Sequence, residues 1–525
     1  MTQGRNIVFY GMFIRKKKNR SGTISVVVVD KSNNRFRELK TIGVSSDEEK
    51  IKYLCKEGEK WILKQSGKID MFATQTQIEE ERQVIDNLIC NIENILLNGT
   101  QLILNKVFDL VGFEAIDDEI LKHLTIARLC QPKSKIGTIN YLKSYFDEDI
   151  AQNKIYRYLD ELNDNKKDKI QKISVEHTQK ILGGQIGLVF YDVTTLYFET
   201  DACDDLRRTG FSKDGKHSNP QIILGLLVSE GGYPLAYFIH EGNKYEGKTM
   251  LPAIENFVSK FNLSDFVIVA DSGLMNNENI LLLEAKNYKY ILGARIKNET
   301  KSITNWILSQ DKTDGNFYEY QKTEKCKLIV GFSQKRAKKD AHNREKGIRR
   351  LEKDFKSGLI TKDKINKRGY NKFLNLQNNI EVKIDYDKIK EDEKWDGFKS
   401  YATNTDLTAE MICEHYSGLW QIERAFRISK GTLDLRPMFH FTPKRIEAHV
   451  CICFVAYKVY KELEWILKLK KINLSVDSVL DIAKTITTLK VKLPKSGETL
   501  TKTMILTERH RQIASLFDEN FWFSI

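Results

Sequence analysis

The hydrophobic pattern of residues 1–66 predicts a small sheet followed by a helix. Turn residues separate three segments that are rich in β-branched side chains, which is typical of antiparallel strands. These segments are 7–14, 23–29 and 35–42. A helical pattern follows over 46–64, with Ser46 as its expected N-cap. Such an α+β module either binds DNA through a strand face or only packs against other parts of the chain.

Residues 67–182 have a helical pattern almost throughout. Within this region, three short amphipathic helices are expected close together, at 119–130, 138–145 and 150–162. Their proportions are those of a helix-turn-helix unit, which makes the region a candidate for binding DNA ends. The alternative is an ordinary helical bundle, because the helix-turn-helix sequence signature is weak.

From residue 183 the period changes to that of strands. Apolar runs and helical segments follow one another in the order β, β, β, α, β, α, β. The expected strands are 186–191, 222–228, 233–239, 266–270 and 288–294, and the expected helices are 248–261 and 277–286. The Glu230-Gly231-Gly232 segment is typical of a hairpin turn between the second and third strands. This order predicts a mixed sheet with helices on its faces.

Residues 298–405 interrupt this rhythm and are expected to form an insertion with a strongly basic helix. Its strand-like segments are 317–322, 327–332 and 380–386. The α/β core that begins in 183–297 is expected to resume in 406–470, with a long helix over 408–428 and an apolar helix over 446–468. The remaining residues, 471–525, are expected to form a mostly helical tail.

Composition narrows the class of protein. With 41% apolar residues among 525, the chain can form hydrophobic cores, which excludes disorder as its main state. Its apolar runs are far shorter than the ~20 residues of a membrane span, and no signal peptide is visible. The eight cysteines are scattered without a CxxC pair, which argues against a disulfide framework or a structural zinc site. We therefore expect a cytoplasmic protein with no membrane partner.

The charge balance favours a polyanionic partner. Lys and Arg number 84 and Asp and Glu 71, so the net charge is 84 − 71 = +13. Spread evenly, this excess would be only a solvated surface, but many cations crowd into one helical segment with few acids between them. They are Lys335, Arg336, Lys338, Lys339, Arg344, Lys346, Arg349, Arg350, Lys353 and Lys356. Nucleic acid is the usual ligand of such a stripe.

Two acids stand where buried strands are expected to end. Asp192 follows one apolar run and Asp271 follows another. Acids at the carboxyl ends of buried strands lie near the rim of a sheet, where sites are often built. Each acid alone could equally be a helix N-cap or a turn residue. Two such acids in one predicted sheet favour a functional site.

A third acid, Glu423, lies on the helix predicted over 408–428. Tyr416 and Lys430 lie seven residues on either side of it, close to two helical turns, so the three side chains are expected to share one face. Arg427 follows four residues later, nearly on the same face. The alternative is a surface Glu paired with Arg427, which does not explain why apolar and aromatic residues flank the acid.

Together these motifs resemble the DDE-type transposases of bacterial insertion sequences, in the branch with a Tyr-x2-Arg-x3-Glu-x6-Lys helix and an inserted β-rich domain. The resemblance covers roughly residues 100–470. One departure is Leu419, which stands where the family has its Arg. The resemblance rests on Asp192-Val193-Thr194-Thr195, 210–216, Pro220-Gln221, Ala270-Asp271-Ser272-Gly273, Tyr416, Glu423, Lys430, Arg436-Pro437 and His449.

The resemblance implies an α/β fold with an RNase H-like core that the insertion interrupts. It also implies that Asp192, Asp271 and Glu423 are catalytic and bind two Mg²⁺ ions, for which Mn²⁺ would substitute. Hard cations take oxygen ligands, and two ions can stabilise both the attacking and the departing oxygen of a phosphodiester. The expected mechanism therefore needs all three carboxylates in one site.

The resemblance further implies contacts with double-stranded DNA, at the element ends and at the target. Tyr416 and Lys430 are expected to contact phosphate beside the cut, and Arg424 or Arg427 to replace the missing Arg. A homodimer or larger synaptic complex on DNA, associated with the nucleoid, is the expected assembly.

The implied function is that of a transposase, which binds terminal inverted repeats and catalyses metal-dependent DNA cleavage and strand transfer. Two alternatives stay open: a catalytically silent repressor derived from such an element, and a DNA endonuclease that cuts without joining. Trp306, Trp395 and Trp420 are candidates to stack on an unpaired base, although a place in the core is the favoured interpretation of each.

Overall fold

The computed structural model divides the chain into two compact units. One comprises Met1–Ile95 and Leu489–Thr501, and the other comprises Leu96–Thr488 and Lys502–Ile525. The residues that the structure describes are 11–31, 35–65, 71–162, 164–212, 215–261, 263, 265–357, 369–377 and 381–518. In this described part of the chain, no helix combines the length and the apolar character that crossing a membrane requires.

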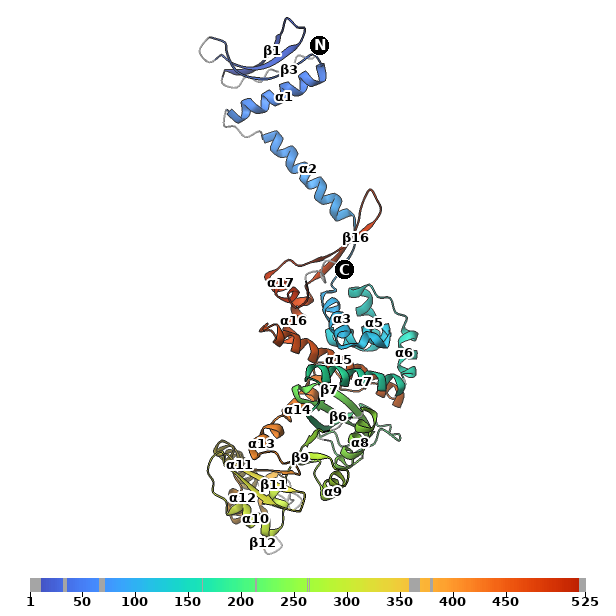
Figure 1. Ribbon diagram of the computed structural model, residues 1–525, viewed down its shortest axis with the longest axis vertical. Helices are drawn as coiled ribbons and strands as arrows, with labels where there is room; N and C mark the ends of the chain where they lie inside the picture. Colours follow the sequence, from blue (N-terminus) through green and yellow to red (C-terminus); the bar gives the residue numbers. More distant parts are fainter. Residues whose placement is uncertain are drawn as a thin grey trace. The chain divides into compact units, whose positions relative to one another are not determined.

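The first unit contains an antiparallel sheet of order β1-β2-β3 and a helix that packs against it (Figure 1). The central strand is buried from Val26 to Val29, and α1 places Ile51 and Ile62 against the sheet. Their bounds are Met12–Lys18 for β1, Ile24–Asp30 for β2, Arg37–Ser45 for β3 and Glu48–Gln65 for α1. The three predicted strands and the helix are confirmed, except that residues 7–10 lie outside the described residues. The N-cap position belongs to Asp47 and not to Ser46, since an Asp47 carboxylate oxygen accepts from the Glu49 N–H at 3.3 Å.

Two predictions for the flanking segments are wrong. A strand, β4 (Ile92–Leu96), follows the long helix α2 (Met71–Cys90) and interrupts the region predicted as helical. The tail contains a strand pair, β15 (Thr487–Lys492) and β16 (Thr499–Met504), which joins β4 in a sheet of order β16-β15-β4. Only two short helices, α16 (Val476–Ala483) and α17 (Glu508–Ala514), are found in the described tail. The pairing partners are nearly 400 residues apart, and local periodicity carries no signal of such a pairing.

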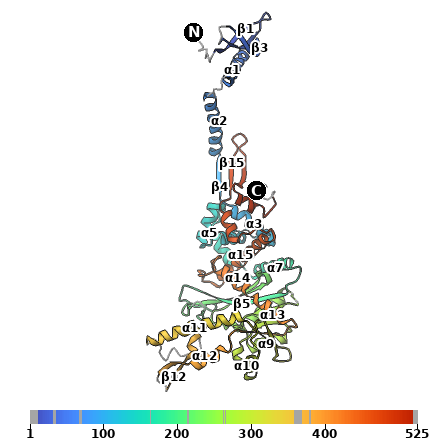
Figure 2. The ribbon, with the colours of Figure 1, turned by 90° about the vertical axis from the view of Figure 1, so that its left-hand side faces the viewer.

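In the second unit, helices gather around α15 (Pro443–Leu469), which is buried along most of its length. It contacts α3, α4, α6 and α7, and it lies between the α3–α5 helices and the sheet (Figures 1 and 2). Its continuous buried run from Ala448 to Leu463 requires neighbours on every side. The surrounding helices are α3 (Gly99–Val111), α4 (Glu119–Cys130), α5 (Lys135–Tyr141), α6 (Gln152–Glu161) and α7 (Asp164–Ile181).

The α/β core is one eight-stranded sheet in the order β10-β11-β14-β9-β8-β5-β6-β7. Strands β5, β6 and β7 form an antiparallel meander, whereas β8 is parallel to β5 and β9 is parallel to β8. Five strands with this order and these directions are the RNase H-like arrangement, so the predicted fold class is confirmed. Their bounds are Leu188–Tyr197, Gln221–Ser229, Pro234–Glu241, Val267–Ala270 and Lys289–Gly293 for β5 to β9.

The segment predicted as an insertion extends this same sheet. Strands β10 (Phe317–Gln321), β11 (Lys327–Phe332) and β14 (Phe398–Thr403) continue it beyond β9. Strand β14 was not among the predicted strands. In its described residues, the segment also contains a separate two-stranded sheet and three α-helices, with these bounds: β12 Leu374–Gln377, β13 Glu381–Ile384, α10 Lys301–Leu308, α11 Gln334–Lys356 and α12 Tyr386–Glu393.

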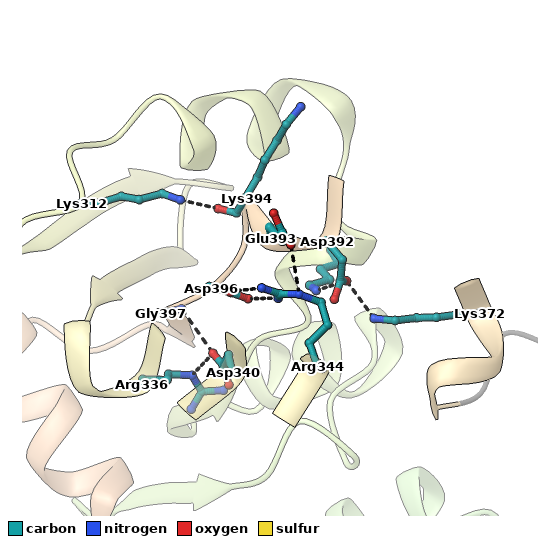
Figure 3. A network of polar contacts seen from close by, with 11 residues as sticks. Lys312, Arg336, Asp340, Arg344, Lys372, Asp392, Glu393, Lys394, Asp396 and Gly397 are labelled. Carbon is teal, nitrogen blue, oxygen red and sulfur yellow. Dashed lines mark hydrogen bonds and ion pairs between the residues drawn. The ribbon is translucent and has the colours of Figure 1, made fainter. Parts of the chain in front are cut away.

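One arginine of the basic stripe holds α11 in place. Figure 3 shows Arg344 directed at Asp396, and two of its nitrogens donate to the two Asp396 carboxylate oxygens at 2.5 and 2.6 Å. Glu393 lies 3.7 Å from the same guanidinium. Only 8% of Arg344 is exposed. The Asp396 hydrogen bonds raise the pKa of Arg344, so this cation has a structural role within the stripe.

The sheet has two covered faces. Phe190 and Val269 belong to the hydrophobic core that includes α14 and α15, whereas Tyr191 and Ile268 belong to the core that includes α8 (Met250–Phe261) and α9 (Asn277–Ala285). This alternation follows from the period of two along a strand.

The helix predicted over 408–428 is two helices, α13 (Ala409–Ser417) and α14 (Trp420–Lys430). The chain passes between them at Gly418, where a side-chain Cβ would come within 2.6 Å of the Phe190 ring. Close packing on the sheet therefore accompanies the break, and a helical period alone does not reveal it.

Candidate functional site

Asp192 and Asp271 lie side by side in the sheet. Tyr191 of β5 pairs with Ala270, the last residue of β8, in parallel register, so the residue that follows each of them is an aspartate on the same face. The prediction that a strand ends at Asp192 is wrong, because β5 continues to Tyr197. It continues because the antiparallel partner β6 runs the whole length of β5, whereas the parallel partner β8 stops at Ala270.

Glu423 reaches the same place from α14. All three acids line one cavity of about 460 Å³ on the sheet face that α13 and α14 cover. Glu423 itself is exposed. The structure thus brings together three acids that are far apart in the chain.

A tyrosine hydroxyl fixes one of the carboxylates. Tyr416 Oη donates to Asp271 Oδ1 at 3.0 Å. Burial, and then the charge of Asp271, raises the pKa of Tyr416, so the hydroxyl stays protonated and remains a donor. Gly293 permits this contact, because a Cβ at that position would collide with the hydroxyl. Asp192 Oδ1 accepts from the Val193 N–H at 2.8 Å.

Two cations that were not predicted as site residues also line the cavity. Arg336 comes from α11 and Lys399 from β14. The Lys399 ammonium lies 4.5 Å from the centre of the Tyr416 ring. Burial, and then the positive charge of Arg336, lowers the pKa of Lys399. Arg336 could have been suspected from the basic stripe, whereas Lys399 lies on a strand that the sequence pattern did not reveal.

The four residues predicted to contact DNA divide into two groups. Tyr416 lines the cavity, and its hydroxyl is engaged by Asp271. Arg424, Arg427 and Lys430 do not line it. The Arg424 guanidinium pairs with Glu464 of α15, and this hydrogen bond raises its pKa. Arg427 is exposed and Lys430 is half-buried.

Leu419 and Trp420 stand at the start of α14 and both line the cavity. Trp420 is 56% exposed, so the preference for a core position is wrong for this tryptophan. Trp306 and Trp395 do pack against a hydrophobic core, and Trp306 lies 4.9 Å from Tyr320 between ring centres.

The donor set at the cavity suits a hard divalent cation. Three carboxylates, with no thiolate or imidazole among the lining residues, are the ligands that Mg²⁺ or Mn²⁺ prefers. Across the described residues, no three acidic, His or Cys side chains are close enough together to hold one ion. The chemistry of the side chains fits such an ion, and the three carboxylates would have to come closer together to share it.

The chain is therefore an α/β protein with an RNase H-like sheet, and three acids line one cavity on that sheet. The family model described as "Transposase DDE domain" matches residues 183–458, more than half of the chain, and the chain belongs to this family. The match includes all three acids. No curated protein matches the chain.

Solved structures of transposases are similar at low identity. A piggyBac transposase synaptic complex with hairpin DNA is 8% identical over 70% of each chain, with a TM-score of 0.38. A Mos1 transposase paired-end complex with the left transposon end is 12% identical over 33% of this chain and 58% of that chain, with a TM-score of 0.16. A Mos1 mariner paired-end complex with Mn is 11% identical over 30% and 54%, with a TM-score of 0.14.

Proposed function

We propose that the chain is the transposase of a bacterial insertion sequence, which binds the terminal inverted repeats of its element and cuts and joins DNA strands. The observation that carries the proposal is the cavity lined by Asp192, Asp271 and Glu423 within a transposase-family domain. A purely DNA-binding role would not need three carboxylates around one cavity, because carboxylates repel phosphate.

Asp192, Asp271 and Glu423 would hold the divalent cations. When bound, such ions stabilise negative charge on the attacking and departing oxygens of a phosphodiester. The Tyr416 hydroxyl orients Asp271 through its hydrogen bond. Lys399 and Arg336 bring positive charge to the same cavity, where they offset the charge of an entering phosphate.

DNA would extend from the cavity along neighbouring surfaces. Exposed Trp420 offers a face for an unpaired base beside the cut. Arg427 and Lys430 lie further along α14, where they would contact backbone phosphates. A homodimer or larger complex would hold two ends together.

The test is a cleavage assay on a labelled duplex taken from the DNA that flanks the gene. Wild-type protein is expected to give a discrete cut with Mg²⁺ or Mn²⁺ and none with EDTA, and Glu423→Gln is expected to bind the duplex without cutting it. Binding without a cut in any metal would favour the silent repressor. A cut without strand-transfer product would favour a nuclease that does not join.

A further inference from the structure

A second cavity lies in the same unit and shares no lining residue with the cavity of the three acids. Its volume is about 440 Å³. The end of α4, the start of α5, α6 and the start of α15 surround it, together with the segment that precedes α15. Its basic lining residues are Arg128, Lys133, Lys135, His440, Arg445 and His449.

Two of these cations are buried without an acidic partner. Arg128 is 6% exposed and Lys135 is 5% exposed. Among the described residues, neither side chain has a hydrogen-bond or ion-pair partner, although Asp434 also lines the cavity. Arg445 differs, because two of its nitrogens donate to Asp160, each at 2.7 Å. Burying an unpaired charge is costly, and an anion in the cavity would remove that cost.

The cations also act on one another. Burial, and then the charge of Arg128, lowers the pKa of Lys135 to about 7. Burial, and then the charges of Lys135 and Arg128, lowers the pKa of His440 to about 4 and also holds the pKa of His449 well below its ordinary value. The His449 Nδ1 atom is buried and has no hydrogen-bond partner in the described part of the molecule. The buried cations Arg128 and Lys135 therefore face a space in which Asp434 is the one carboxylate among the lining residues.

The start of α15 lies at the same cavity, which Thr442 and Arg445 line. Thr442 is its N-cap, and the Thr442 hydroxyl accepts from the Arg445 N–H at 3.4 Å. Pro443 has no N–H and the Arg445 N–H is already capped, so this helix start would favour an anion through its dipole. Phe439 and Phe441, which are 67% and 48% exposed, stand at this cavity. Exposed aromatic rings beside a cationic cavity are the usual platform for a nucleotide base.

We propose that this cavity binds a phosphate group of a nucleic-acid strand, held by Arg128 and Lys135 beside the start of α15, with the adjoining nucleoside against Phe439 or Phe441. The assignment to nucleic acid rests on the proposed function. The inference that the cavity binds a phosphate group does not rest on the proposed function. Free inorganic phosphate is the other possible source of that group.

The first arm of the test uses inorganic phosphate. Calorimetric titration of wild-type protein with potassium phosphate at pH 6.5, where Lys135 is mainly protonated, is expected to show saturable binding that potassium chloride at equal ionic strength does not compete away. Lys135→Met is expected to weaken this binding at least tenfold. The exposed Lys154 of α6 gives a matched control, and Lys154→Met is expected to leave phosphate binding unchanged.

The second arm uses a labelled 40-base-pair duplex and fluorescence anisotropy at several salt concentrations. Lys135→Met is expected to weaken DNA binding about tenfold and to reduce the salt slope by about 1, because one phosphate contact is lost. The double variant Phe439→Ala, Phe441→Ala is expected to weaken binding of the duplex and to leave binding of inorganic phosphate unchanged.

Three results would overturn parts of the proposal. Absence of phosphate binding to the wild type, together with equal duplex affinity of Lys135→Met, would overturn the site. Phosphate binding with unchanged duplex affinity would overturn nucleic acid as its source. If Lys135→Met fails to fold, the wild-type phosphate titration still decides, since it needs no variant. None of these measurements uses the three acids, so their failure is distinguishable from failure of the proposed cleavage.

Discussion

The hydroxyl of Tyr416 could either contact DNA phosphate or orient Asp271, and its hydrogen bond decides between these two roles. The sequence predicts a contact with DNA phosphate, whereas the structure gives the hydroxyl to Asp271. A hydroxyl has one proton to donate. While Asp271 accepts that proton, Tyr416 positions a carboxylate and cannot donate to phosphate.

Tyr416→Phe is therefore expected to slow cleavage about 10- to 100-fold, because a hydrogen bond to a charged group contributes roughly 1.5–3 kcal/mol. Duplex affinity is expected to stay within about twofold. Single-turnover cleavage rates and anisotropy titrations measure the two quantities separately. Tyr401→Phe is the control, since the Tyr401 hydroxyl contacts Cys413 instead. Lost affinity with an unchanged rate would support a phosphate contact.

Gly293→Ala is expected to slow cleavage in the same way while residue 416 remains a tyrosine. Its Cβ would displace the Tyr416 hydroxyl from Asp271, so cleavage is expected to fall at least as far as in Tyr416→Phe. Gly187→Ala is the control, because nothing lies within 4 Å of a Cβ there. Full activity of Gly293→Ala would mean that the hydrogen bond is dispensable.

The three acids could be found from sequence because an acid beside apolar residues is uncommon unless a site requires it. Lys399 could not be found in this way. Its neighbours in β14 show no clear alternation, and it reaches the cavity only through the pairing of β14 with β9. Side chains that a distant pairing brings to a site leave no local pattern.

At the scale of elements, α14 is tied to α15 by a small ionic cluster. Glu464 of α15 accepts from Arg424 and Lys461. Burial raises the pKa of Glu464, but the hydrogen bonds and positive charges of Arg424 and Lys461 together outweigh burial and lower the pKa below its ordinary value. Arg424, predicted as a DNA ligand, is thus engaged within the protein and positions the helix that carries Glu423.

Arg424→Gln is expected to lower the free energy of unfolding by roughly 1–2 kcal/mol at pH 7, between the values for exposed and buried ion pairs. Because the Glu464 pKa is lowered on folding, the stabilisation exists above its ordinary value of 4.5 and is lost as pH falls through the folded pKa. Urea unfolding should therefore show a smaller difference in the free energy of unfolding between wild type and Arg424→Gln at pH 3.5 than at pH 7. Arg427→Gln, on the same helix but exposed, is the control. A difference that does not depend on pH would argue against this pair.

The basic helix α11 offers a contrast between exposed and buried cations. Lys339, Lys346 and Arg350 are exposed and fall on one helical face. Changing all three to Gln is expected to weaken duplex binding, lower its salt slope by up to about 3 and leave thermal unfolding unchanged. Arg344→Gln is expected to lower the thermal unfolding temperature and to leave duplex binding and its salt slope unchanged, because it removes the partner of Asp396. An unchanged salt slope in the triple variant would make the stripe a solvated surface.

At the scale of the whole chain, local pattern accounts for most elements but not for how they join. Strands such as Val267–Ala270 and helices such as Glu119–Cys130 follow from their own residues. The sheet of β4, β15 and β16 depends on partners from opposite ends of the chain. The break at Gly418 depends on Phe190, which lies far away in sequence. The features that could not be predicted are those that form only when two segments distant in sequence come into contact.

Because β10, β11 and β14 extend the core sheet, replacing residues 298–405 with a short Gly-Ser linker is expected to lower thermal stability as well as abolish cleavage. Strand β9 would become an unprotected edge, and Arg336 and Lys399 would be lost from the cavity. Circular dichroism melting and the cleavage assay measure the two effects. Replacing only 375–383, in the separate two-stranded sheet, is the control. A variant that melts like the wild type would make the segment an independent insertion.

The parallel pairing of β5 with β8 has a consequence for how such a chain tolerates changes in length. Outside β6, β7 and α8, the connection between the two strands can gain or lose residues while Tyr191 stays opposite Ala270, so the two aspartates remain neighbours. A single residue inserted within β8 would instead turn Asp271 to the opposite face, among the side chains packed against α8 and α9. Length variation should therefore be tolerated in the parts of the connection outside β6, β7 and α8, and absent from the four residues of β8.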